Sequence, residues 1–290
     1  MAYEDLTHIL RGYSKAMYAT WFYYKPDHLL FDAGEGVASS LDNAVFGIQS
    51  VFLSHGHIDH ISGLPTLVHI RSAGMGEKTK PLTVYYPEGD RYISLLSQYI
   101  DRTNPGLTFE LHWEPLQPGQ RLELSGGSQH GRALETFQTQ HTPGRLSLGF
   151  NVLEKRRKLR PEFAHLSEAE IRARVRTSGR EELTYAYEQK RLSYAGDSMP
   201  VRVEDVCCTD LLLHEATFLT AQDRQRPVHA TLEETLDLAA AAAVKGLVLF
   251  HISSRYPLPG VRREVCQQAR RRKLEVPIWL WWNERLERLV

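Results

Sequence analysis

The sequence has no excess of charge of either sign. Lysine plus arginine and aspartate plus glutamate both number 35 in the 290 residues, so the formal net charge is zero. A protein that attracts polyanions through its overall charge carries a large positive excess. This balance excludes bulk attraction to nucleic acid or to an acidic surface, so any basic surface must be local.

Long apolar runs and cysteines are also scarce. The longest apolar runs, such as LAAAAAV and GLVLF, are far shorter than a membrane-spanning helix of roughly 20 residues, and the first residues lack the basic and apolar regions of a secretory signal. The cysteines, Cys207, Cys208 and Cys266, are odd in number and have no metal-ligand spacing. We therefore expect a cytoplasmic protein with reduced thiols and no membrane partner.

What is present is an alternation of short strand and helix patterns. Runs rich in Val, Leu, Ile, Phe or Tyr and bounded by turn residues predict strands at 28–34, 50–56, 82–87, 134–141, 191–197, 210–217 and 246–253. Helical patterns fall at 61–74, 90–100 and 231–246. In the last of these, Thr231 and Glu234 predict a capping box. The order of elements indicates an α/β fold.

Histidines or acidic residues follow several of these strands where the strands end. They are His55, His141, Asp197, the pair His214 and Glu215, and His251. In α/β folds the loops at the carboxyl ends of the strands build the ligand site. We therefore expect these side chains to converge.

The densest group lies in VFLSHGHIDHISGLP, where His55, His57, Asp59 and His60 occupy six positions. Burying four such residues unpaired is costly, and a divalent cation is the ordinary compensation. His55 and His57 can point into one pocket while Asp59 and His60 come round the turn to a second, which favours two ions. Nitrogen and oxygen ligands suit Zn²⁺ and admit Mn²⁺ or Fe²⁺. Two ions ~3.5–4 Å apart can bring a bridging water to a pKa near 7, which indicates hydrolysis through a bridging hydroxide.

These motifs resemble a known family. HGHIDHISG resembles the HxHxDHxxG signature of the metallo-β-lactamase superfamily, and FDAGEG at 31–36 resembles its first motif. HEAT at 214–217, HATLEET at 229–235 and FHISSRY at 250–256 are similar to segments of ribonuclease Z, the endonuclease family that trims the 3′ ends of tRNA precursors. The resemblance implies a four-layer αβ/βα sandwich, with residues 1–290 as a single domain. It also implies an RNA substrate and a homodimer.

The resemblance also implies a set of site residues. Asp59 would orient the attacking water, and Asp32 would lie behind the metal ligands. Glu215 and His229 would form an acid pair that protonates the departing 3′ oxygen; a structural ion pair is the alternative. The implied ligands are His55, His57 and His141 for one metal ion, Asp59, His60 and His251 for the other, and Asp197 as a bridge between them.

Outside the resemblance, Arg255 could bind a phosphate oxygen through its planar guanidinium, or it could form a surface salt bridge. A second basic group on the C-terminal helix pattern could add to a nucleic-acid surface. Its members are Arg262, Arg263, Arg270, Arg271, Arg272 and Lys273.

The chain also departs from the family pattern. RGYSKAMYATWFYYKPDH replaces a Gly-Thr-rich loop, and the sequence has no Gly-Pro dipeptide of the kind found in the family's tRNA-clamping arm. Residues 155–191, with eleven Lys or Arg against six Glu, stand there instead. We expect this basic insertion or reduced arm to be compact, with a short helix capped by Ser167 and Glu170 and followed by Gly179. It could contact phosphates or be a solvated helix.

Several functions remain open from the sequence alone. The first is a ribonuclease Z-like endonuclease, and the second is a phosphodiesterase of the same fold that acts on small or cyclic phosphodiesters. A non-catalytic RNA-binding relative and a carbon-ester or thioester hydrolase are weaker alternatives. The late segment VPIWLWWNERLERLV could cover a partner or form a final core strand.

Overall fold

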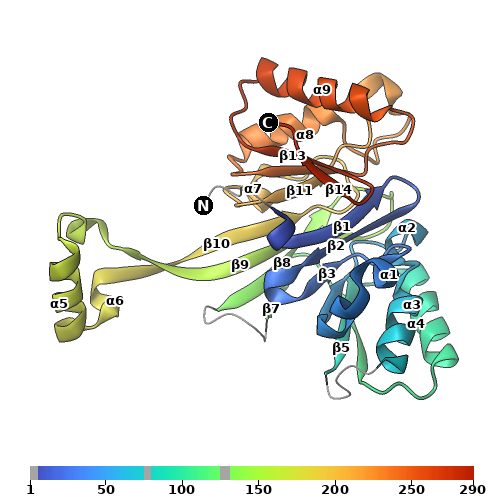
Figure 1. Ribbon diagram of the computed structural model, residues 1–290, viewed down its shortest axis with the longest axis horizontal. Coiled ribbons are helices and arrows are strands. Elements are labelled where there is room, and N and C mark those ends of the chain that lie inside the picture. Colours follow the sequence, from blue (N-terminus) through green and yellow to red (C-terminus); the bar gives the residue numbers. More distant parts are fainter. Residues whose placement is uncertain (1–5, 75–79, 125–130) are drawn as a thin grey trace.

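The computed structural model describes residues 6–74, 80–124 and 131–290. Two β-sheets pack face to face, and helices cover the outer face of each (Figure 1). This is the four-layer αβ/βα sandwich that the family resemblance implies. Within the described residues, no helix is both long enough and apolar enough to cross a membrane.

The first sheet has the strand order β1-β2-β3-β4-β5-β6. Strands β3 to β6 run parallel, and β1 and β2 form an antiparallel hairpin at one edge. This hairpin is made by the residues that replace the family's Gly-Thr-rich loop. The bounds are β1 Leu10–Lys15, β2 Ala19–Tyr24, β3 Leu29–Phe31, β4 Ser50–Phe52, β5 Leu82–Pro87 and β6 Leu111–Leu116.

The second sheet has the order β14-β13-β12-β11-β10-β9-β8-β7. Strands β10 to β13 are parallel, and the strands at both flanks are antiparallel. The bounds are β7 Arg121–Glu123, β8 Arg132–Thr139, β9 Ser147–Leu159, β10 Thr184–Tyr194, β11 Leu212–Glu215, β12 Leu247–Phe250, β13 Ile278–Trp282 and β14 Arg285–Arg288.

The α-helices lie on the outer faces of the two sheets and at the end of a projection. Short 3₁₀ turns at Leu6–His8, Lys25–Asp27, Asp42–Gly47, Pro161–Phe163 and Ala221–Asp223 connect other elements. The α-helices are α1 Val37–Leu41, α2 Ile58–Ile61, α3 Leu64–Ala73, α4 Arg91–Thr103, α5 Glu168–Ser178, α6 Arg180–Leu183, α7 Val203–Val206, α8 Leu232–Ala241 and α9 Leu258–Arg271.

The central core lies between the sheets and is rich in aromatic rings. Phe22 makes edge contacts with Tyr194, Phe250 and Trp281 at centroid distances of 5.1 to 5.8 Å. Such pairs stabilise a core beyond the area that they bury. Trp281 is therefore part of a core strand, and the reading of the tryptophan-rich segment as a final strand is correct.

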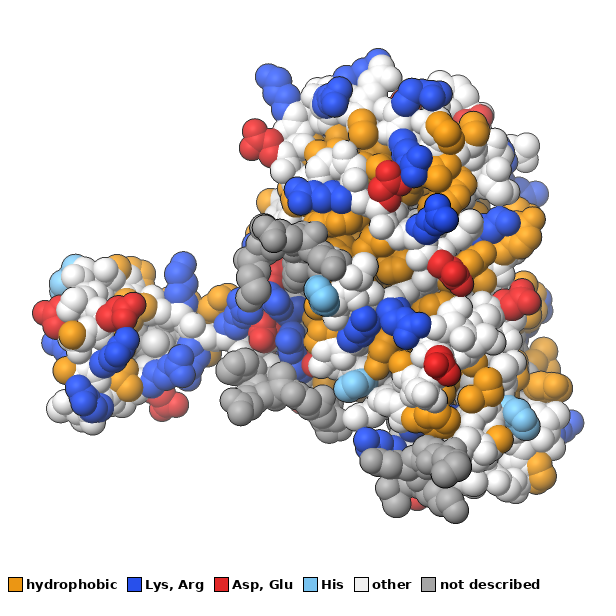
Figure 2. Space-filling model, viewed as in Figure 1, with side chains coloured by type: hydrophobic (Ala, Val, Ile, Leu, Met, Phe, Trp, Pro, Cys, Tyr) orange, Lys and Arg blue, Asp and Glu red, His pale blue; other side chains and the backbone are white. Residues whose placement is uncertain are grey.

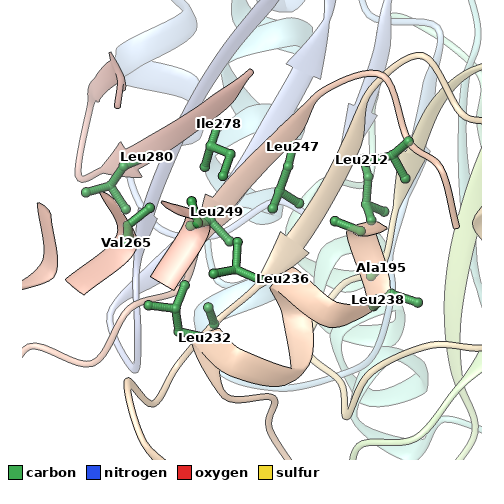
Figure 3. Packing of buried hydrophobic residues seen from close by; sticks show 14 of the residues in the cluster. Ala195, Leu212, Leu232, Leu236, Leu238, Leu247, Leu249, Val265, Ile278 and Leu280 are labelled. Atoms are coloured by element: carbon green, nitrogen blue, oxygen red, sulfur yellow. The ribbon is translucent and has the colours of Figure 1, made fainter. Parts of the chain in front are cut away.

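The outer cores fix the helices to the sheets. The apolar faces of α8 and α9 pack on β11, β12 and β13, where Leu232 and Leu236 of α8 lie over Leu249 (Figure 3). Helices α1, α3 and α4 cover the first sheet in the same way. The predicted capping box of α8 is present: the Thr231 hydroxyl accepts from the Glu234 N–H, and the Glu234 carboxylate accepts from the Thr231 N–H.

The basic segment 155–191 is extended rather than compact. Strands β9 and β10 continue beyond the sheet as a two-stranded ribbon, and α5 and α6 lie at its far end (Figure 1). The antiparallel ladder satisfies the backbone of the ribbon without a hydrophobic core, which explains how so polar a segment can project. We call residues 155–191 the arm. The predicted helix is present as α5, with its capping box formed by Ser167 and Glu170.

Candidate metal centre

The loops at the ends of β4, β8, β10 and β12 bring the predicted ligands together at one edge of the sandwich. The side chains form two groups, and within each group the candidate ligand atoms lie within 4.8 Å of one another. One group is His55, His57 and His141, and the other is Asp59, His60, Asp197 and His251.

The distances inside these groups fit a shared cation. His60 Nε2 and His251 Nε2 lie 3.3 and 3.2 Å from Asp197 Oδ2, and Asp59 Oδ2 lies 3.9 and 3.7 Å from the same two nitrogens. Two ligands that each bind zinc at about 2.0–2.1 Å in tetrahedral geometry are separated by about 3.3 Å. The spacing is therefore close to that of atoms around one ion.

The outer nitrogens of His55, His141 and His251 contact the protein, so that their inner nitrogens face the centre. His141 Nδ1 donates to the carbonyl of Val228 at 2.8 Å, and His251 Nδ1 donates to Thr217 Oγ1 at 2.8 Å. His55 Nδ1 lies 3.0 Å from Ser54 Oγ. Such contacts orient metal-binding histidines and fix their tautomers.

Asp32 anchors this arrangement from behind. Its Oδ1 accepts from the Ser54 N–H at 2.7 Å, and its Oδ2 accepts from His60 Nδ1 at 2.7 Å and from the Tyr194 hydroxyl at 2.5 Å. Asp32 has a φ of 56°, a left-handed conformation that is uncommon for residues other than glycine and that clusters at functional sites. His251 has a φ of 57°, and its N–H donates to Ser14 Oγ at 2.9 Å.

Gly34 allows the FDAGEG loop to approach the histidine loop. A Cβ atom at this position would lie 2.3 Å from the Asp59 carbonyl oxygen and 2.7 Å from the Thr20 nitrogen. No side chain fits there, because both contacts are with backbone atoms. The glycine in this motif is therefore required by the close packing of two loops that carry site residues.

Glu215, which is buried, and His229, which is partly exposed, form a pair beside the second ligand group. His229 Nδ1 lies 2.6 Å from Glu215 Oε1, and the Thr217 hydroxyl donates to Glu215 Oε2 at 2.5 Å. Because Thr217 Oγ1 also accepts from His251, one chain of hydrogen bonds joins the pair to a candidate ligand. Burial alone would lower the pKa of His229, but the Glu215 carboxylate outweighs it and raises the pKa to about 9.

His55, His141 and Asp197 have the charge states that suit a cation. Burial, followed by the nearby His60 and His141, holds the pKa of His55 well below its ordinary value, and burial also lowers the pKa of His141. Neutral imidazole is the form that binds metal. Burial would raise the pKa of Asp197, but His251 and His60 hold it well below its ordinary value, so this residue stays a carboxylate. Burial would lower the pKa of His60, but Asp197 and Asp32 raise it well above its ordinary value, so this residue must lose a proton to bind a cation.

Several inner atoms are buried without a hydrogen-bond partner among residues 6–74, 80–124 and 131–290. They are His55 Nε2, His60 Nε2, His251 Nε2 and Asp197 Oδ1. Buried polar atoms nearly always have a hydrogen-bond partner, so several unpartnered atoms that face one another need an explanation. A divalent cation supplies it, and the His and Asp groups are suited to binding metal ions.

Two other predicted residues lie outside the ligand groups. Arg255 is exposed over the Phe218 ring, and its Nε and Nη1 donate to Ser253 Oγ and to the Asp223 carbonyl. Its phosphate contact stays a prediction. His214 does not converge with the other residues at the strand ends, because its buried ring points toward α8 and its Nδ1 donates to the carbonyl of Glu215.

Sequence reasoning missed three supports of the site. Thr217 lies inside the HEAT motif, so its position close to Glu215 could have indicated that it supports the site. Tyr194 and Ser14 reach the site from β10 and β1. Nothing local in the sequence marks either of them as a partner of Asp32 or His251.

Comparison with known proteins gives one consistent result. A family described as "Beta-lactamase superfamily domain" matches residues 28–252. The ribonuclease Z of Methanosarcina mazei is 33% identical over 258 residues, which cover 80% of each chain. The ribonuclease Z of Methanosarcina acetivorans is 34% identical over 251 residues, or 79% of each chain.

Solved structures share the fold at lower identity. The short form of human tRNase Z is 21% identical, with a TM-score of 0.62 over 97% of this chain and 99% of its own. The metallo-beta-lactamase fold protein YhfI from Bacillus subtilis is 17% identical, with a TM-score of 0.64 over 96% of this chain and 99% of its own. The fold and the histidine and aspartate groups define a metal-dependent hydrolase of the beta-lactamase superfamily. Within that superfamily, the chain belongs to the ribonuclease Z family.

Proposed function

We propose that this chain is a two-metal endonuclease that hydrolyses a phosphodiester bond at the 3′ end of tRNA precursors. The observation that carries the proposal is the Glu215 and His229 pair, held at 2.6 Å next to the ligand groups. When a phosphodiester bond in RNA is hydrolysed, the ribose oxygen of the broken P–O bond leaves as an alkoxide. That alkoxide needs a proton, and this pair can supply one. The ribonuclease Z proteins to which the chain is related support the choice of substrate.

The proposed ligands follow the two groups. His55, His57 and His141 would hold one ion, Asp59, His60 and His251 would hold the other, and Asp197 would bridge them. The orphaned Oδ1 of Asp197 supports the bridge, since its Oδ2 already faces His60 and His251. All the proposed ligand atoms are nitrogen or oxygen, which favours Zn²⁺, with Mn²⁺ or Fe²⁺ as substitutes.

The two ions would supply a water that ionises near neutral pH and a positive field for the phosphate. The chain's own groups do the rest in this proposal. The Asp59 carboxylate accepts a hydrogen bond from the attacking water and aims it at phosphorus. Glu215 holds His229 through Nδ1, and His229 donates the proton on Nε2 to the departing 3′ oxygen.

The arm supports an RNA substrate. Strand β9 runs from the site to the arm over 13 residues, which is about 40 Å at the usual rise of a strand. Several arm cations have no ion pair within the described parts of the chain: Lys158, Arg160, Arg176 and Arg180. Lysine and arginine side chains also lie on the face of the arm seen in Figure 2. These positive charges would contact phosphates far from the scissile bond.

The remaining expectations belong to the same proposal. We infer that residues 1–290 act as one domain of which the arm is an insertion, and that the protein forms a homodimer in the cytoplasm. Arg262 and Arg272 of the second basic group pair with Glu287, Asp237 and Glu233, so fewer of its cations would be available to RNA.

The test is cleavage of a tRNA precursor with a 3′ trailer by purified, metal-loaded protein, compared with Asp59→Ala. The proposal expects cleavage at the 3′ end and a loss of about 10²-fold to 10⁴-fold in the variant, the range for removing a positioned catalytic group. Robust hydrolysis of bis(p-nitrophenyl) phosphate with no precursor cleavage above the variant would instead favour a phosphodiesterase for small substrates. Absence of bound metal would revive a non-catalytic RNA-binding role.

A further inference from the structure

A second cluster of charge lies beside the metal centre and takes no part in the chemistry above. Arg91 and Tyr92 begin α4, and Arg145 lies in the loop after β8. The Nη2 atoms of both arginines donate to the Tyr92 hydroxyl at 3.2 Å. The guanidinium groups also lie over the Tyr92 ring, 5.0 and 4.6 Å from its centroid.

Arg91 and Arg145 both donate to the neutral hydroxyl of Tyr92 and to no carboxylate that the structure describes. In the described parts of the chain, neither Arg91 nor Arg145 has an ion pair, and both are exposed. The nearest acid along the chain, Asp90, is engaged: its Oδ1 accepts from the Tyr92 and Ile93 N–H groups, and its Oδ2 accepts from the Gly56 N–H. The oxygens of Asp90 therefore face backbone N–H groups, and the two guanidinium groups converge on the Tyr92 oxygen instead. The hydrogen bond from Arg91, followed by that from Arg145, lowers the pKa of the Tyr92 phenol.

The cluster is fixed relative to the metal centre. Asp90 joins the start of α4 to Gly56, which lies between His55 and His57. A Cβ atom on Gly56 would lie 2.3 Å from Asp90 Oδ1, so the contact requires glycine. Arg145 also lines the same small pocket as His57 and His141. Asp90 lines this pocket too, and its volume of about 10 Å³ is too small for a phosphate, but the shared lining shows that Arg145 lies beside the candidate ligands.

We propose that Arg91 and Arg145, held together by Tyr92, bind a backbone phosphate of the RNA next to the bond that is cleaved. The ligand class is a polynucleotide phosphodiester, because a guanidinium fork matches phosphate oxygens and each arginine here keeps donors free. This site deepens the proposed function and rests on it. A substrate with a single phosphate, which must occupy the metal centre, has no second phosphate to offer the cluster.

The test compares two substrates in matched variants of the metal-loaded full chain. The variants are Arg145→Ala, Arg91→Ala and Arg145→Lys, and the control is Arg102→Ala. Arg102 is exposed in the last turn of α4, about 16 Å along the helix from Arg91. The substrates are a tRNA precursor with a 3′ trailer and bis(p-nitrophenyl) phosphate.

Arg145→Ala is expected to lower kcat/KM for the precursor by about 10-fold to 100-fold, the range for a lost charge-assisted hydrogen bond, mainly through KM. This loss should exceed the loss on the diester at least tenfold, and Arg145→Lys should recover part of it. Arg91→Ala should act in the same direction, and Arg102→Ala should change neither substrate. The dependence of log kcat/KM on log salt should become shallower by about 0.7 to 0.9 in Arg145→Ala, as one phosphate contact predicts.

Each contrary result has its own meaning. Equal losses on both substrates, or a precursor loss in Arg145→Ala no larger than in Arg102→Ala, would overturn the phosphate site and leave the proposed function in place. Failure of the unaltered protein to cleave the precursor while it hydrolyses the diester would overturn the proposed substrate, and this site with it. Metal content measured for every variant separates both results from a damaged centre.

Discussion

Helices α8 and α5 begin with the same local signal and lie in opposite surroundings. Each has a capping box, Thr231 with Glu234 in α8 and Ser167 with Glu170 in α5. Helix α8 then buries Leu232, Leu236 and further residues against the second sheet, whereas α5 buries no residue at all. The same sequence rule therefore starts a helix of the core and a helix at the end of the arm.

The metal centre and the arm are stabilised by different kinds of contact. The metal centre is held by contacts between distant parts of the chain, such as the bond from Tyr194 to Asp32. The arm is held by its own backbone ladder and by short-range pairs, such as Arg172 with Glu168. We therefore expect changes at the centre to affect all chemistry, and changes in the arm to affect only substrates large enough to reach it.

Removal of the proposed bridge between the ions should have the largest effect. Asp197→Ala deletes a buried carboxylate that lies 3.3 and 3.2 Å from two candidate ligand nitrogens. We expect the bound metal to fall from two ions per chain to one or none, and hydrolysis of both the precursor and the small diester to fall at least ~10³-fold. Elemental analysis and rates on both substrates measure this. Retention of two ions and of activity would contradict the bridging role.

The next effect should depend on the leaving group. His229→Ala removes the proposed proton donor without removing a proposed metal ligand. Cleavage of RNA should slow by about 10²-fold to 10⁴-fold, while bis(p-nitrophenyl) phosphate should be affected much less, because p-nitrophenolate departs without a proton.

The same experiment tests the structural alternative for the pair. If His229 and Glu215 only stabilise the fold, His229→Ala would slow both substrates alike and would lower the midpoint of denaturation. Metal content should remain that of the unaltered protein, which serves as the control for an intact centre.

The sequence predicted much of the centre and little of what supports it. His55, His141, Asp197 and His251 follow strand patterns, so a rule about strand ends brings them together. His214 obeys the same rule and still points away, because alternate residues on β11 face opposite sides of the sheet. Local pattern did not show this, since the side chains that occupy each face come from other parts of the chain.

The strands of the arm could not be predicted from the local sequence pattern either. Residues 155–159 pair with residues 184–188, although the first run, KRRKL, is almost wholly cationic and the second, TYAYE, has no branched aliphatic residue. A strand is recognised in a sequence by an apolar face, and a ribbon that projects into solvent has none. Their pairing depends on each other across the hairpin, so only the capped helix between them could be predicted.

Deletion of the arm should separate large substrates from small ones. Residues 157–186 can be replaced by Asn-Gly, because Arg156 pairs with Tyr187 across the ladder and this turn closes a two-residue hairpin. We expect precursor cleavage to fall by about 10-fold to 100-fold, mainly through KM and with a shallower salt dependence. Rates on the small diester and the two-ion content should match those of the unaltered protein. Equal losses on both substrates would contradict an RNA-binding arm.

The smallest effects should come from the two caps with which the comparison began. Thr231→Ala removes the acceptor for the Glu234 N–H at the start of a packed helix, and it should lower the free energy of unfolding by about 1 kcal/mol. Ser167→Ala removes the matching acceptor in α5, and it should change global stability by no more than about 0.5 kcal/mol, because unfolding of α5 exposes no buried face. Urea denaturation at constant slope measures both. A loss in Ser167→Ala as large as that in Thr231→Ala would mean that the arm folds cooperatively with the sandwich, and that the two regions are less independent than their contacts indicate.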